Sequence, residues 1–239
     1  MSFEFRLSRT LRIERRLLGS EQEPLLIVDD LLEAPKRLVD YACTQVAFRP
    51  AWRVDGGFPG LRAAAPLNYV KAVVTALGPV VRQAFALGDA QPAGAECNLS
   101  LVTLPPKRLT AEQRIPHIDT TDPLQFAFLH YLCETRYGGT AFYRHRATGF
   151  EAVTPGRSAR YEQTVAEELA QQPPAVGYVG EDDSRYWEIG RVEAQFNRLV
   201  IYRSRLLHSG RPDPALLSAD PASGRLTANI FVHFARPRC

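Results

Sequence analysis

The chain has 239 residues, of which 45% are hydrophobic and 23% are charged, a composition typical of a globular protein that excludes a disordered one. Its 29 basic and 26 acidic residues give a formal charge of +3 and are mixed along the sequence, so we expect neither a nucleic-acid nor a membrane partner. The N-terminus lacks an apolar core of signal-peptide length, and the four cysteines form no Cys-x-x-Cys pair, so we expect a cytoplasmic protein with reduced thiols.

The first part of the chain is expected to be largely helical. Four segments are expected in chain order: a strand over 24–32, a helix over 35–48, a loop rich in glycine and proline over 53–66, and a helix over 67–77. Gly78 and Pro79 are expected to break the second helix, and a further helical turn or two follows over 80–87.

After about residue 95 the pattern changes to strands. β-Branched and aromatic residues, separated by Gly, Pro and Asp, predict strands over 96–104, 124–133, 139–153, 195–203 and 225–234. A helix is expected over 157–174 and a long polar and aromatic loop over 175–190. Helices followed by strands predict a mainly β protein with flanking helices (α+β). Its core would be a curled antiparallel sheet or a double-sheet barrel, with the N-terminal helices packed on one outer face.

We expect one domain over 1–239. Residues 24–95 would form the N-terminal strand and its supporting helices, and residues 96–236 the barrel core. A lid-like insertion is expected at about 157–190, because long loops in compact domains are often functional.

Strand alternation separates structural histidines from candidate ligands. His130 shares a strand face with Phe126 and Phe128, so we expect it to be a structural residue on the helix-covered face. His145 lies between two arginines and is expected on a solvated or polar face. His233, near the end of the chain, is also expected to be structural.

The remaining histidines, His117 and His208, form a candidate metal centre with Asp119. His117 and Asp119 are two residues apart after a proline, so in an extended chain both side chains point the same way. His208 follows a strong strand and precedes a Gly-Pro turn. Two imidazoles and one carboxylate are the facial triad of non-haem Fe(II) oxygenases, which leaves coordination positions open.

The sequence resembles the Fe(II)/2-oxoglutarate-dependent dioxygenases over roughly residues 96–236. The motifs occur in that superfamily's order: PHIDTTD, FAFLHYLCETRYGGTAFY, NRLVIYRSRLLHSG and GRLTANIFVHF. The segments FPGLR, GGTAFYR and FNRLVIY are similar to an uncharacterised bacterial branch of it. The resemblance implies a double-stranded β-helix (jelly-roll or cupin-like) barrel, with Fe(II), 2-oxoglutarate as cosubstrate and O₂.

The resemblance also implies roles for individual residues. Arg225 would bind the far carboxylate of 2-oxoglutarate, because a guanidinium can hold a carboxylate through two hydrogen bonds. The alternatives are that Arg225 is a solvated arginine at the start of a strand, and that Arg211 or Arg203 takes this role. Thr227 would add a hydroxyl group from the same strand face, and Tyr131 occupies the aromatic position that often faces the cosubstrate. Because Asp119 keeps a carboxylate where halogenating relatives have a small residue, hydroxylation is favoured over chlorination.

The substrate is expected to be a small molecule, an amino acid or a peptide side chain. Candidate substrate-binding residues are Arg62, Tyr143, Arg144, Tyr186 and Trp187. For Tyr186 and Trp187 simple burial at the barrel rim is an equal alternative, and Arg62 could be a surface charge in a tight turn.

Two other functions use the same three ligands. One is a cupin-like metal-dependent hydrolase or isomerase that needs no keto acid, and the other is a catalytically silent barrel used for binding. Arg225 distinguishes the oxygenase from the hydrolase or isomerase, because the latter needs no cation on the barrel floor.

Overall fold

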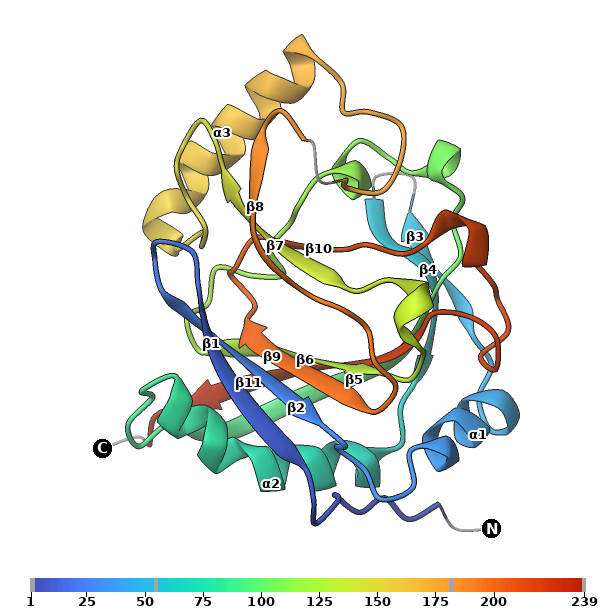
Figure 1. The fold of residues 1–239 in the computed structure, drawn as a ribbon. Coiled ribbons are helices and arrows are strands. Elements are labelled where there is room, and N and C mark those ends of the chain that lie inside the picture. Colours follow the sequence, from blue (N-terminus) through green and yellow to red (C-terminus); the bar gives the residue numbers. More distant parts are fainter. Residues whose placement is uncertain (1–2, 54–55, 181–182, 238–239) are drawn as a thin grey trace.

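The computed structural model describes residues 3–53, 56–180 and 183–237, which form two antiparallel sheets (Figure 1). The larger sheet has the strand order β1 (Arg12–Leu18), β2 (Glu23–Asp29), β9 (Arg198–Arg203), β6 (Gln125–Tyr131), β11 (Leu226–Ala235), β5 (Gln91–Val102), β4 (Gly56–Ala64) and β3 (Arg49–Arg53). The smaller sheet has the order β10 (His208–Gly210), β7 (Thr140–His145) and β8 (Tyr186–Val192). The prediction of a mainly antiparallel β fold is confirmed, although hydrogen bonds within the described ranges leave two sheets and no closed barrel.

Three α-helices flank the sheets in the described part of the chain: α1 (Lys36–Thr44), α2 (Leu67–Ala84) and α3 (Pro155–Gln171). α2 lies across the outer face of the larger sheet, and α3 lies beside the smaller one (Figure 1). α1 and α2 share one hydrophobic cluster with the outward-facing residues of the larger sheet. None of these described helices is long and apolar enough to cross a membrane.

Strand alternation on β6 separates the two faces of the larger sheet. Phe126 and Phe128 pack against the helices, whereas Ala127 and Leu129 face the smaller sheet. His130, on the helix side, is fully buried, and its Nδ1 lies 2.9 Å from the hydroxyl of Tyr69 on α2. Burial lowers the pKa of His130 to about 4. The expectation that His130 is a structural residue on the helix-covered face is confirmed.

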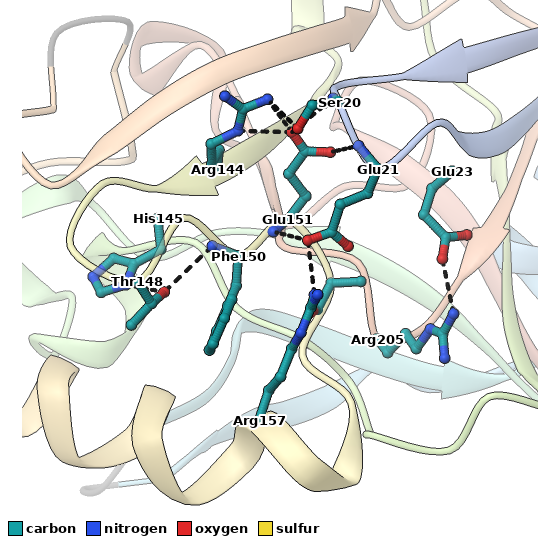
Figure 2. A network of polar contacts seen from close by, with 11 residues as sticks. Ser20, Glu21, Glu23, Arg144, His145, Thr148, Phe150, Glu151, Arg157 and Arg205 are labelled. Carbon is teal, nitrogen blue, oxygen red and sulfur yellow. Dashed lines mark hydrogen bonds and ion pairs between the residues drawn. The ribbon is translucent and has the colours of Figure 1, made fainter.

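A buried ion cluster holds the turn between β1 and β2 against the hairpin that follows β7 (Figure 2). The Glu151 side chain is fully buried. It accepts hydrogen bonds from the backbone N–H groups of Ser20 and Glu21, both at 2.9 Å, and from the guanidinium of Arg144. Gly19 has φ +60°, and a Cβ there would collide with the Glu151 carboxylate. Glu151 therefore replaces the water that these turn N–H groups would otherwise bind.

Three sequence predictions of local structure were wrong. Most of the Gly- and Pro-rich stretch 53–66 forms β4 (Gly56–Ala64), Arg53 ends β3, and residues 54 and 55 lie outside the described residues. Gly60 permits this because a Cβ there would run into the Leu101 carbonyl of β5. α2 continues through Pro79, which costs one helical hydrogen bond and does not end the helix. The expected loop 175–190 contains the start of β8, and its residues 181 and 182 also lie outside the described ranges.

His145 is buried, contrary to the expectation of a solvated or polar face. Its side chain is fully enclosed, with Nε2 2.9 Å from Glu168 of α3 and Nδ1 2.9 Å from Thr148. The ring also contacts Tyr161 and Tyr186. The arginines beside it in sequence point to the other face of the strand, so their charge does not mark the environment of His145. His233 is exposed and pairs with Asp122 at 3.1 Å.

Candidate metal centre

Backbone hydrogen bonds bring the two halves of the candidate metal centre together. His117 and His208 form an isolated antiparallel bridge, in which each backbone N–H donates to the other residue's carbonyl at 2.9 Å. Two residues on, the N–H of Asp119 donates to the carbonyl of Ser204 at 2.8 Å. This segment is therefore extended beside β10, and the side chains of His117 and Asp119 leave it on the same side as His208.

The three side chains converge as predicted. One ligand atom from each of His117, Asp119 and His208 lies within 4.8 Å of the others. The imidazole centroids are 4.5 Å apart, and His208 Nε2 is 3.8 Å from Asp119 Oδ2. Ligands about 2.1 Å from a common ion lie roughly 3 Å from each other. Small side-chain rotations would therefore bring this group to the geometry of a metal site.

The protonation of the three groups also suits a cation. His208 Nδ1 lies 2.8 Å from the Leu206 carbonyl, which can only accept, so Nδ1 carries the proton and Nε2 keeps its lone pair for the site. His208 is a buried residue, whereas His117 and Asp119 keep part of their surface in contact with solvent. Desolvation of the two rings still lowers the pKa of both imidazoles to about 4, which keeps them neutral. Burial raises the pKa of Asp119 to about 6, against the opposing effects of His117 and Arg62. A bound cation would offset this cost of ionising Asp119.

The three ligands border a cavity of about 370 Å³ between the two sheets. Its floor is the inner face of the larger sheet, and its lining includes polar or charged residues from several strands and loops: Arg62, Glu112, Gln113, Thr140, Tyr178, Tyr202, Ser209, Arg225, Thr227 and Asn229. The Tyr202 ring packs 4.8 Å from that of His208, which fixes one side of the imidazole. A pocket of this size is at the small end of the range for ligand sites.

Arg225 is a buried cation on this floor. It is 4% exposed, and its Nη2 donates to the Gly139 carbonyl at 2.8 Å. Its Nε is buried without a hydrogen-bond partner, and no carboxylate in the described part of the chain forms an ion pair with it. Thr227, two residues on, is also buried in the cavity wall. An uncompensated buried guanidinium is costly, so an anionic ligand would be favourable here.

Tyr131 contacts Arg225 and does not line the cavity. The Arg225 guanidinium lies 5.6 Å from the Tyr131 ring centroid, and the Tyr131 hydroxyl lies 2.6 Å from the hydroxyl of Thr140. Thr140 itself lines the cavity. Tyr131 is therefore placed to support Arg225.

Of the predicted substrate-binding residues, the structure places Arg62 in the cavity wall. Tyr143 and Tyr186 are buried between α3 and the smaller sheet. Arg144 pairs with Glu151 (Figure 2), and Trp187 is 47% exposed beneath the guanidinium of Arg146. None of these four lines the cavity. On β7, Phe142 packs in the apolar cluster between the two sheets, and its neighbour Tyr143 points the other way, toward α3. A substrate role for them stays a prediction.

Sequence reasoning missed Tyr202, which borders both the cavity and His208. The signal was present, since Tyr202 shares the inward face of β9 with Val200. Phe58 and Gln113 were also missed. Nothing in their local sequence indicates that the 56–64 strand and the 112–114 turn meet at the cavity.

Comparison with known protein families finds a match over nearly the whole chain. The model of a family described as "Family of unknown function (DUF6445)" matches residues 9–232. No curated protein matches the chain. The match spans all three candidate ligands together with Arg62 and Arg225.

Proposed function

The chain belongs to a family whose function is unknown, and we propose from the chemistry of its site that it is a non-haem Fe(II)/2-oxoglutarate-dependent oxygenase. It would hydroxylate a small molecule, an amino acid or a peptide side chain. His117, Asp119 and His208 would hold Fe(II), which accepts neutral imidazole together with a hard carboxylate. When bound, Fe(II), 2-oxoglutarate and O₂ supply the oxidation, in which 2-oxoglutarate becomes succinate and CO₂ and the substrate gains a hydroxyl group.

The observation that carries this proposal is the buried Arg225 in the same cavity as the three ligands. Its Nε lacks a partner, and no described carboxylate pairs with it. A metal-dependent hydrolase that uses the same ligands has no need of a buried cation beside its metal. A dicarboxylate that chelates the metal through its keto acid end would satisfy Arg225 with its far carboxylate.

The remaining residues would orient and shield the cosubstrate. Arg225 and Thr227 would bind its far carboxylate, while Tyr131 and the Gly139 carbonyl hold the guanidinium in place. Tyr202 would keep His208 in orientation and exclude water from that side of the metal. We also propose that the two sheets correspond to the walls of a double-stranded β-helix, since their inner faces share one apolar cluster.

Anaerobic addition of Fe(II) and 2-oxoglutarate to the protein tests the proposal. We expect the weak visible charge-transfer band of the chelate, and we expect it to be lost in His208→Ala. His233→Ala is the matched control, because His233 is exposed and lies outside the ligand group. Wild-type protein that binds Fe(II) without developing the band would refute the 2-oxoglutarate part of the proposal. A band that persists in His208→Ala would refute the ligand assignment.

A further inference from the structure

Arg62 is a second cation in the cavity wall, and the proposed function leaves it without a role. It lies on β4, and its guanidinium stacks 4.6 Å from the Phe58 ring centroid, which holds it in place. Its Nε is buried without a hydrogen-bond partner. Among the described residues, no carboxylate lies within ion-pair distance of it. Arg62 is therefore held in position at the cavity wall with one buried donor, its Nε, that lacks a partner.

The sheet register separates Arg62 from the proposed cosubstrate site. Arg62 is paired with Ser100 of β5, and Ser100 is paired with Thr227 of β11. Side chains in one such row point to the same face. Two strand spacings of about 4.8 Å put the Cα atoms of Arg62 and Thr227 roughly 10 Å apart across the sheet. Arg62 and Arg225 therefore come from different strands at separate points of the cavity floor, which favours two anion sites over one.

The surroundings of Arg62 favour a carboxylate over a phosphate. Asp119 borders the same cavity as Arg62. Burial lowers the pKa of Arg62, and the charge of Asp119 opposes that shift. Glu112 also borders the cavity. A dianionic phosphate would be repelled by these acidic groups more strongly than a monoanionic carboxylate. The planar guanidinium also matches the two oxygens of a carboxylate.

We propose that Arg62 binds a carboxylate group of the substrate, so that the enzyme acts on a small carboxylic acid or on the carboxylate end of a longer molecule. This inference rests on the proposed function, because it assigns Arg225 to 2-oxoglutarate. The cavity of about 370 Å³ must hold the cosubstrate as well, which limits the enclosed part of the substrate to a few heavy atoms.

Calorimetric titration tests this proposal without an identified substrate. The probes are acetate, propionate, benzoate and the L-amino acids, each compared with its primary amide, titrated into protein that is saturated with Co(II) and 2-oxoglutarate. We expect at least one acid to bind and its amide to bind far more weakly. Loss of a partly buried ion pair should weaken that acid about 30-fold or more in Arg62→Gln. Arg62→Lys keeps the positive charge but loses the planar guanidinium, so its affinity for the acid should lie between those of the wild type and Arg62→Gln.

Arg49→Gln is the matched control, since Arg49 faces Arg62 across β3 and β4, is exposed and does not line the cavity. It should bind the acid as the wild type does. Equal binding of acid and amide, unchanged binding in Arg62→Gln, or no binding by any acid would overturn the proposal. So would loss of the 2-oxoglutarate band in Arg62→Gln together with its retention in Arg225→Gln.

The two proposals fail in different ways. If the wild type shows no charge-transfer band, the proposed function fails. The same acids and amides can then be titrated into metal-free wild type and Arg62→Gln, which still measures whether Arg62 selects a carboxylate. If the band is present and acids are not preferred over amides, only the carboxylate proposal fails.

Discussion

Replacing Arg225 with methionine should separate stability from cosubstrate binding. The substitution removes the buried positive charge and keeps much of the apolar volume of the side chain. It forfeits the hydrogen bond to the Gly139 carbonyl, worth about 1 kcal/mol, and the contact with the Tyr131 ring, worth about 0.5–1 kcal/mol. Two changes act in the opposite direction and stabilise the variant. The unpaired buried Nε, which destabilises the wild type by about 1–3 kcal/mol, is removed, and so is the cost of desolvating the charge.

These opposing contributions leave Arg225→Met, without cosubstrate, as stable as the wild type or more stable by about 1 kcal/mol, which is a rise of about 2–4 °C in Tm for a chain of this length. In contrast, 2-oxoglutarate should bind about 30-fold or more weakly and should no longer raise Tm. Differential scanning calorimetry with and without 2-oxoglutarate and Co(II) measures both effects. A variant destabilised by more than about 2 kcal/mol that keeps its affinity for 2-oxoglutarate would show that Arg225 is a structural residue, and the reasoning would be refuted.

Three further predictions concern the ligands and the ion pairs. Asp119→Asn should weaken Co(II) binding about 100-fold or more in calorimetric titration, because a neutral amide replaces the charged ligand; unchanged affinity would exclude Asp119 as a ligand. Glu151→Ala should lower the free energy of unfolding in urea by about 3 kcal/mol and leave Co(II) affinity unchanged, because it frees two turn N–H groups and Arg144 outside the cavity. Asp29→Asn should make the free energy of unfolding depend less steeply on pH at acidic pH. Arg198 lowers the pKa of Asp29, so the stability from this pair is complete above the unfolded pKa of about 3.9 and is lost as the pH falls through the lower folded pKa; an unchanged acid limb in urea titrations would contradict this.

Periodicity predicted the parts of the fold in which one strand face is apolar. β6 alternates between phenylalanines that pack under α2 and residues that face the cavity, so the face of His130 could be assigned before its partner Tyr69 was known. The same reasoning placed His117 and Asp119 on one side of an extended segment. Their approach to His208 depends on backbone pairing between segments about ninety residues apart, which the order of the motifs indicates and periodicity does not.

Strands without an apolar face were missed. β1 has the sequence RIERRLL, in which all but the last residue are exposed, so its pairing with β2 leaves no alternation to read. β4 contains three glycines and a proline, which are signals of a loop. It is nevertheless a strand, because its residues from Gly60 to Ala64 pair with β5 and close approach there requires a glycine. Arg62 was identified as a candidate substrate-binding residue but was assigned to a loop, whereas it lies on β4 in the cavity wall.

The substrate-binding residues were the least predictable part of the site. The hairpin after Gly139 was expected to present Tyr143 and Arg144 to the cavity, and a register shift between Phe142 and Tyr143 marks the point where β7 and β8 lose regular pairing. Tyr143 instead packs under α3. Which residues of a hairpin face inward depends on such shifts, and a single sequence does not reveal them.

The formal charges in the cavity of the proposed complex sum to zero. Arg62, Arg225 and a divalent metal ion are opposed by Asp119, the two carboxylates of 2-oxoglutarate and one carboxylate of the substrate, so the formal charges cancel. Glu112 is exposed and is solvated at the cavity mouth. A neutral substrate would leave one guanidinium uncompensated in a partly buried site, and a phosphate would leave an excess negative charge beside Asp119. The same balance favours a dianion beside Arg225 in the proposed complex, because without one the metal ion and both arginines would face Asp119 and a single carboxylate.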